Sequence, residues 1–190
     1  VTTAAGKRVT YTVRGVYRSR PLTRVVFDRR LRTRVSARVF STLDAGPIVE
    51  LAAAAERAGW QGFAFTEHPA PTATWLAAGG HQSLDPFVAL SHVAAVTTEL
   101  QLLTYVAVLP YRNPASLAKS AATVDKLSNG RLILGVGAGY LKAEFFALGV
   151  DFDERNVLFD EALDVLPLHW AGEPFDYEGK FFNILKGEAN

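Results

Sequence analysis

The sequence contains neither cysteine nor methionine. The absence of cysteine excludes a disulfide framework and any metal site built on thiolate ligands. No apolar run approaches the about 20 residues that a membrane-spanning helix requires, so we expect no membrane association and take the cytoplasm as the default location. Apolar residues nevertheless make up 49% of the chain, which is enough for the packed core of one domain.

Acidic residues are almost absent from the first 40 positions, where eleven basic side chains stand against Asp28 alone and give a net charge of +10. The other 150 residues therefore carry −9, because the net charge of the whole chain is +1. Ordered periodicity begins only at about Thr42. We therefore interpret residues 1–42 as an atypical Arg-rich segment outside the domain, and residues 43–190 as the domain itself.

Three functions compete for residues 1–42: a basic arm for nucleic acid, an Arg-rich transit peptide, and a membrane-surface segment. Because the composition changes so abruptly, we favour a fourth interpretation, in which the segment is not a designed structural element, as with a misassigned start. We accordingly do not expect nucleic acid as a partner. The chain begins with Val1 instead of methionine, which we interpret as the sign of a fragment or a conceptual translation.

Helical spacing of apolar residues alternates with short apolar runs from residue 43 onward. The expected helices lie at residues 47–58, 86–96 and 114–127, and each is followed by an expected strand, at residues 62–66, 100–108 and 132–136. The strands begin about 30 residues apart, which is the length of one βα unit. The pattern predicts a parallel sheet covered by helices, either doubly wound or closed into a barrel.

Two more helices are expected over residues 142–148 and 156–170, and we expect Pro167 to kink the second or end it early. Aromatic residues around Glu178 and Gly179 predict a small hairpin over residues 173–182. Beyond it, the sequence indicates no further element.

Gly135, Gly137 and Gly139 follow the strand at 132–136, which we expect to be buried on both faces. Their spacing is not that of the dinucleotide-binding fingerprint, and no Lys-Ser or Lys-Thr follows as in a P-loop. Two interpretations stay open. The glycines either allow a strand to turn tightly into a helix, or they let the backbone approach a flat ligand.

Several segments in order carry a resemblance to a known family. They are residues 55–60 (AERAGW), 65–69 (FTEHP), 84–90 (LDPFVAL), 109–114 (LPYRNP), 125–131 (DKLSNGR) and 135–140 (GVGAGY). From about residue 41 to residue 182 the chain resembles the luciferase-like monooxygenase superfamily, and most closely its subgroup of oxidoreductases that use the deazaflavin coenzyme F420.

The resemblance implies an α/β fold of the (β/α)8 TIM-barrel type, with the cofactor at the carboxyl ends of the strands. Such barrels take about 250 residues, so we expect an incomplete barrel, with the amino-terminal strand replaced and the carboxyl-terminal half missing. We expect such a chain to be weakly stable by itself. The resemblance also suggests a homodimer for a full-length protein.

The resemblance further implies a set of site residues. His68 would lie beside the reactive ring carbon and orient substrate or exchange a proton, although it could instead tie down its loop through its neighbours. Implied cofactor-binding residues are Glu67, Thr104, Tyr105, Val106, Gly137, Gly139 and Tyr140. A non-prolyl cis peptide is expected at Tyr105–Val106. Trp75 would either cover the cofactor or pack under a loop.

Tyr140 stands where one sugar-phosphate dehydrogenase branch of the family carries an acidic glutamate, which argues against the same substrate here. The remaining histidines lack metal-ligand spacing, and we predict no metal site. The predicted function is hydride transfer between F420 and a small organic substrate. The alternatives are an FMN-dependent monooxygenase and an inactive truncated product.

Overall fold

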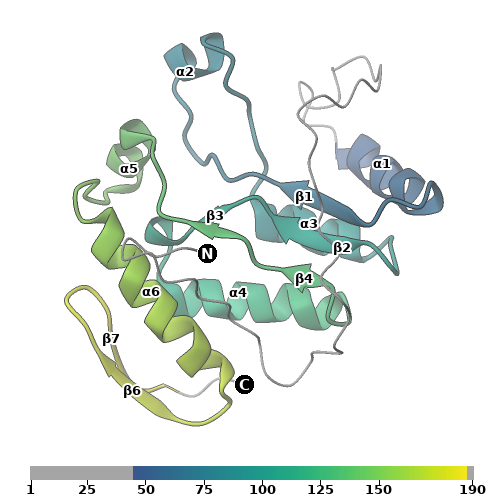
Figure 1. Cartoon of the computed structure of the whole chain (residues 1–190). Helices are drawn as coiled ribbons and strands as arrows, with labels where there is room; N and C mark the ends of the chain where they lie inside the picture. Colours follow the sequence, from purple (N-terminus) through teal and green to yellow (C-terminus); the bar gives the residue numbers. More distant parts are fainter. Residues whose placement is uncertain (1–44, 188–190) are drawn as a thin grey trace.

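A parallel sheet forms the centre of the computed structural model, which describes residues 45–187 (Figure 1). Strands β1 (Gly62–Phe65), β2 (Gln101–Thr104) and β4 (Leu132–Ile133) pair side by side in the order β1-β2-β4. Beyond short breaks, β3 (Ala107–Val108) pairs in parallel with β5 (Val136–Gly137). The second and third predicted strands are therefore each divided in two. The segment 1–42 and the strand expected before residue 41 lie outside the described residues.

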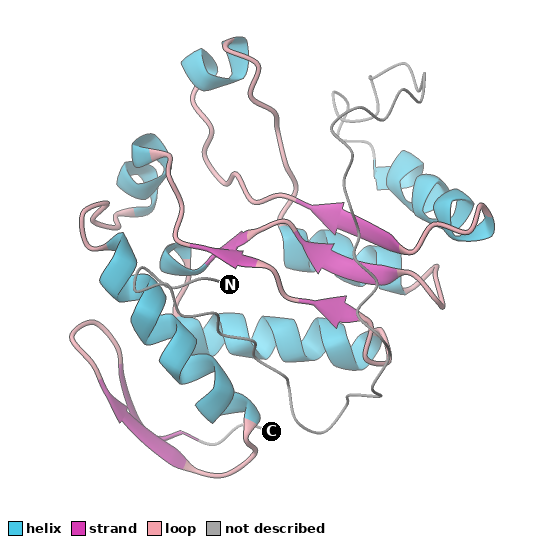
Figure 2. Cartoon of the chain, in the orientation of Figure 1, coloured by secondary structure: helices cyan, strands magenta, loops and turns pink. Residues whose placement is uncertain are grey.

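Helices connect the strands (Figure 2); three of them lie where the sequence predicts, and two short ones, at residues 73–77 and 109–111, were not predicted. They are α1 (Ala45–Arg57), the short α2 (Ala73–Ala77), α3 (Pro86–Ala94), the 3-10 turn η1 (Leu109–Tyr111) and α4 (Pro114–Leu127). Asp85 and Asn113 cap α3 and α4, because each side chain accepts hydrogen bonds from the first free backbone N–H groups of its helix. A proline follows each cap, at a position that needs no N–H donor.

Helices α3 and α4 cover one face of the sheet (Figure 1). Leu90 and Val93 of α3 and Leu102 of β2 are fully buried, and Leu117 and Val124 of α4 are almost so. These side chains belong to one continuous apolar core. Consecutive strands are neighbours and no strand order reversal occurs among them, so the described sheet has the arrangement of a barrel wall.

After the sheet come α5 (Lys142–Leu148), α6 (Arg155–Trp170), and an antiparallel hairpin of β6 (Phe175–Glu178) and β7 (Asn183–Gly187). The hairpin lies along α6 (Figure 1). The carboxylate of Glu161 on α6 accepts hydrogen bonds from the backbone N–H groups of residues 180–182, which fastens the turn of the hairpin to the helix.

Arg131 joins the strands at their amino ends. Its guanidinium is buried, and its five N–H groups donate to oxygens of Ala94, Thr97, Leu100 and Ser128 at 2.7–3.1 Å. Close by, the Glu56 carboxylate accepts from the backbone N–H groups of residues 98–100. Both residues therefore hold the turn that leads into β2.

Three expectations about local structure are wrong. Ile133 is 38% exposed, so the third strand is not buried on both faces, because no described strand pairs with its outer edge. Helix α6 does not end early at Pro167 but continues to Trp170, since a proline so near the helix end removes only one backbone hydrogen bond. Residues 183–187 form β7 although their side chains show no clear alternation.

No helix within residues 45–187 is long and apolar enough to cross a membrane.

Candidate active site

The predicted site residues lie at the carboxyl ends of the parallel strands. Glu67 and His68 follow β1, Tyr105 and Val106 separate β2 from β3, and the loop 137–140 follows the pairing of β5. Because parallel strands place their carboxyl ends at one edge of the sheet, three segments distant in sequence meet there. We call this edge the carboxyl edge.

The break between β2 and β3 contains the cis peptide bond Tyr105–Val106, at the position predicted from the sequence. The backbone on both sides of the break remains hydrogen-bonded. Tyr105 N donates to Phe65 O at 2.7 Å, and Ala107 N donates to Gly135 O at 2.8 Å. The same Gly135 oxygen accepts from the buried Thr104 hydroxyl at 2.7 Å. Thr104 thus binds the neighbouring strand from within the core.

The glycines after β4 are required by close packing inside the protein. A Cβ atom at Gly135 would lie 2.3 Å from the carbonyl oxygen of Thr104, and one at Gly137 would lie 2.9 Å from Cγ2 of Val106. Gly139 has φ +80°, a conformation that residues with a side chain rarely adopt. At Gly135 the close approach is to the protein's own backbone, which favours the tight-packing interpretation at this position.

His68 sits in a ring of aromatic side chains at the carboxyl edge. Its imidazole centroid is 4.5 Å from that of Trp75, 5.0 Å from that of His81 and 6.4 Å from that of Tyr140. Its backbone N–H donates to Ser83 Oγ at 2.7 Å, which fixes the loop. With a side chain only 10% exposed, His68 is a positioned residue and not a surface histidine.

His81, an exposed loop residue, also belongs to this cluster. Its Nε2 lies 2.9 Å from Thr66 Oγ1. Burial lowers the pKa of His81, and the neighbouring His68 lowers it further. Both effects favour a neutral His81.

Glu144, on the first turn of α5, contacts His68 from the protein interior. Its Oε2 lies 3.4 Å from His68 Nδ1 and accepts a hydrogen bond from the Tyr111 hydroxyl at 2.9 Å. The side chain is almost fully buried. Burial raises the pKa of Tyr111, and the hydrogen bond to Glu144 raises it further, so Tyr111 remains a protonated donor.

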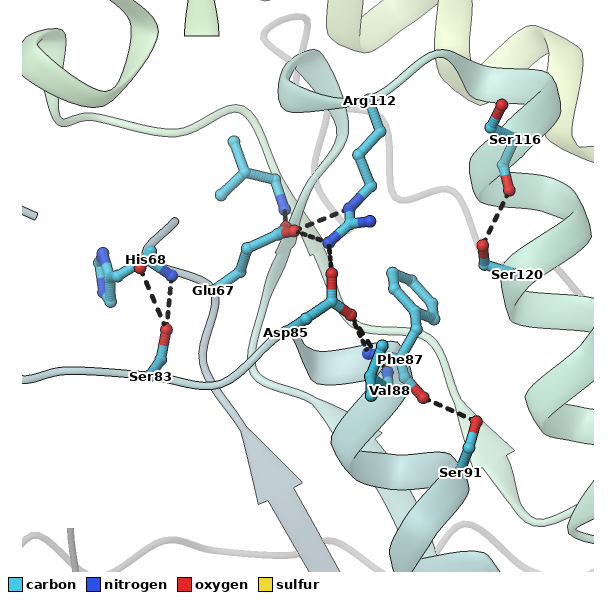
Figure 3. Close-up of polar contacts among 11 residues, drawn as sticks. Glu67, His68, Ser83, Asp85, Phe87, Val88, Ser91, Arg112, Ser116 and Ser120 are labelled. Atoms are coloured by element: carbon cyan, nitrogen blue, oxygen red, sulfur yellow. Dashed lines mark hydrogen bonds and ion pairs between the residues drawn. The ribbon is translucent and has the colours of Figure 1, made fainter. Parts of the chain in front are cut away.

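Glu67 points away from His68 and into a partly buried ion network (Figure 3). Its Oε1 accepts from Nε and Nη2 of Arg112 at 2.8 and 2.5 Å, and its Oε2 accepts from Val108 N at 2.6 Å. Arg112 Nη2 also reaches Asp85 Oδ2 at 2.7 Å, while Asp85 Oδ1 caps α3. The network joins the end of β1, the end of β3 and the start of α3.

Burial raises the pKa of Glu67 despite the opposing effects of Arg112 and of the Val108 N–H group. For Asp85, burial acts in the same upward direction, but the hydrogen bonds from Arg112 and from the start of α3 prevail and lower its pKa. Arg112 therefore compensates one carboxylate that is buried and a second that is half exposed.

The structure brings His68, Tyr105, Val106, Gly137 and Tyr140 to the carboxyl edge. Glu67 and Thr104 instead bond to the protein itself from beneath that edge. Sequence reasoning did not assign roles to Tyr111, Arg112 and Glu144. Tyr111 and Arg112 stand inside one of the segments that carry the family resemblance, and that was the available signal.

Comparisons with known proteins agree with this geometry. Residues 27–189 match the family described as luciferase-like monooxygenase. An F420-dependent glucose-6-phosphate dehydrogenase from Kineococcus radiotolerans is 34% identical over 143 residues, which are 73% of this chain and 41% of that protein. The chain spans between 36% and 41% of the length of the curated relatives that it matches.

Two solved structures share the fold. The monooxygenase RslO1 from Streptomyces bottropensis has a TM-score of 0.68 and 29% identity, with 80% of this chain and 46% of that one covered. The oxygenating constituent of 3,6-diketocamphane monooxygenase from Pseudomonas putida, in complex with FMN, has a TM-score of 0.65 at 22% identity, with 76% and 39% covered. The second likeness concerns the fold alone.

These matches confirm the predicted fold class, part of a TIM-type α/β barrel. The family match extends over most of the sequence and includes every strand end of the carboxyl edge. From the match, the fold and the positions of these strand ends together, we conclude that this chain belongs to the luciferase-like monooxygenase family.

Proposed function

We propose that this protein is an oxidoreductase that transfers a hydride between coenzyme F420 and a small organic substrate at the carboxyl edge. The observation that carries the proposal is the convergence of His68, the Tyr105–Val106 bond and the 137–140 loop at one edge. A relative that is 34% identical is named for its dependence on F420, which supports the choice of cofactor.

The residues present fit a flat ring system. Tyr105, Val106 and Tyr140 are 55%, 38% and 65% exposed, so apolar surface remains uncovered at the carboxyl edge. The loop at Gly137 packs closely against Val106, and a side chain at position 137 would collide with Val106. Tyr105, Val106, Gly137 and Tyr140 would contact the ring.

The bound cofactor would accept or donate the hydride, and the protein would supply orientation and proton transfer. His68 is the group suited to move a proton, since an imidazole changes its charge near neutrality. Ser83 holds its backbone and Trp75 packs against its ring, so the imidazole has a fixed position.

An FMN-dependent monooxygenase is the second candidate, favoured by the fold shared with an FMN-bound monooxygenase structure and with RslO1. Both candidates use the same edge and differ in the cofactor and in the need for oxygen. Oxygen-dependent turnover with reduced FMN, and none with reduced F420, would favour the monooxygenase.

Titration of the chain with F420 and with FMN, followed by cofactor fluorescence, tests the proposal. We expect saturable binding of F420 that Gly137→Val abolishes and Arg57→Met leaves unchanged, since Arg57 is an exposed residue of α1. His68→Asn should retain binding but lose turnover, whereas His92→Asn, at an exposed position, should change neither binding nor turnover. Failure to bind either cofactor at high concentration would support the inactive product instead.

A further inference from the structure

The buried carboxylate of Glu144 has few hydrogen-bond donors. Its Oε2 contacts Tyr111 and His68, and its Oε1 has no hydrogen-bond partner among the described residues. A carboxylate that is 1% exposed cannot rely on water, and an unpaired buried polar atom costs about 1–3 kcal/mol. Among the described residues, the Tyr111 hydroxyl and His68 Nδ1 are therefore the two groups that can stabilise this carboxylate.

This arrangement determines which nitrogen of His68 carries its hydrogen. Oε2 already accepts the hydrogen of the Tyr111 hydroxyl and is therefore an acceptor atom, so a bare Nδ1 lone pair facing it would be repelled. Hydrogen on Nδ1 instead gives a bond to Glu144, and a neutral imidazole then has no hydrogen on Nε2. The other contacts of the His68 ring are with Trp75, His81 and Tyr140, and none of these side chains is a carboxylate.

We propose that Glu144 is a positioning residue that fixes His68 in the tautomer with hydrogen on Nδ1, and that Tyr111 holds Glu144 in place. His68 Nε2 is then the atom that exchanges a proton with the substrate. This use of the tautomer rests on the proposed function, but the tautomer itself is a property of the chain without cofactor. Orientation of an imidazole by a carboxylate on its far nitrogen is an effective way to prepare a proton acceptor.

The tautomer can be read from nitrogen chemical shifts. The chain is labelled with ¹⁵N-histidine, and long-range ¹H–¹⁵N correlations are recorded without cofactor at a pH where the imidazoles are neutral. The cross-peaks that are absent from the spectrum of His68→Asn are those of His68. We expect a protonated Nδ1 and an unprotonated Nε2 in the unaltered chain.

Glu144→Met removes the acceptor and should shift His68 toward the form with hydrogen on Nε2, which free imidazole side chains prefer. The matched control is Glu173→Gln, an exposed glutamate after α6, and it should leave the spectrum unchanged. Because Glu144→Met also leaves the Tyr111 hydroxyl unpaired, the double variant with Tyr111→Phe provides a better-satisfied background for the same measurement.

Hydrogen on Nε2 in the unaltered chain would overturn the proposal, whether or not any variant folds. An unchanged His68 spectrum in Glu144→Met or in the double variant would overturn it as well. Because no cofactor enters the experiment, a failure of F420 and FMN to bind would refute the proposed function and leave this result intact.

Discussion

Arg112→Met should destabilise the fold strongly, and it should do so mainly at neutral pH. Arg112 donates twice to Glu67 and once to Asp85, and its guanidinium lies over the Phe87 ring at 5.1 Å. Without it, the carboxylate of Glu67 keeps a single hydrogen bond, from Val108 N, in a site that is 5% exposed. Removing one partner of a buried ion pair costs about 3–5 kcal/mol. Because the Arg112 side chain is 26% exposed, we expect the lower end, about 3 kcal/mol.

The sign of the pH dependence follows from Glu67. Its pKa is raised in the folded protein, mainly by burial, and loss of Arg112 would raise it further. A carboxyl group with a raised folded pKa binds a proton more tightly when folded, so its cost to stability disappears as pH falls through that pKa. The deficit of Arg112→Met should therefore shrink between neutrality and pH 4.5, the ordinary value for glutamate.

Urea unfolding followed by tryptophan fluorescence at two pH values measures this effect. Arg57→Met is the matched control, because Arg57 is exposed and exposed substitutions usually change stability by less than about 0.5 kcal/mol. Glu67→Gln in the Arg112→Met background removes the unpaired charge and should recover part of the loss. If Arg112→Met alone does not fold, the double variant should restore a cooperative transition.

Three results would refute the reasoning. Arg112→Met could cost no more than Arg57→Met at neutral pH, its deficit could grow on acidification, or Glu67→Gln could fail to relieve it. Each would mean that the carboxylate of Glu67 does not depend on Arg112.

Other substitutions test the rest of the framework. Gly135→Ala places a Cβ against the Thr104 carbonyl and should cost about 1–3 kcal/mol in urea unfolding, with weaker cofactor binding; unchanged stability would contradict the close packing. Glu56→Gln should flatten the acid limb of the stability curve. Backbone hydrogen bonds, of which that from Glu99 has the largest effect, lower the pKa of Glu56. The ionised Glu56 side chain therefore stabilises the fold above pH 4.5, and this stabilisation is lost as pH falls. The same acid limb in Glu56→Gln and in the unaltered chain would contradict this prediction. Arg131→Lys, with fewer donors, should lower the urea midpoint by an amount equivalent to about 2 kcal/mol while leaving cofactor affinity unchanged, and a selective loss of affinity would contradict a purely structural role.

Local sequence features predicted the helices and strands well. Asp85 and Asn113 marked helix starts because their side chains can satisfy free N–H groups within three residues. The sequence did not predict that two strands are interrupted, after Thr104 and after Ile133. An apolar run has the same composition whether or not its backbone hydrogen bonds to the neighbouring strand are continuous. Only the resemblance indicated the cis bond between Tyr105 and Val106.

The buried polar contacts were harder to predict. Glu67 and Arg112 are 45 residues apart, and Glu144 is 76 residues from His68. No periodicity links residues at such separations, because their contact results from the sheet bringing strand ends together. A sequence alone identifies the charged residues but not which of them share a proton or an ion pair.

The five hydrogen bonds of Arg131 have a practical consequence for altering the protein. These bonds connect segments at the amino ends of the strands. None of the residues that accept them belongs to the carboxyl edge. Loops at the carboxyl edge can therefore be randomised in directed-evolution libraries for new substrates. Arg131 and the residues that accept its hydrogen bonds should be kept unchanged, because they stabilise the fold. In a saturation mutagenesis screen, variants at Arg131 other than Arg131→Lys should be lost at the level of soluble expression, whereas variants at Tyr140 should be expressed and should differ in substrate preference.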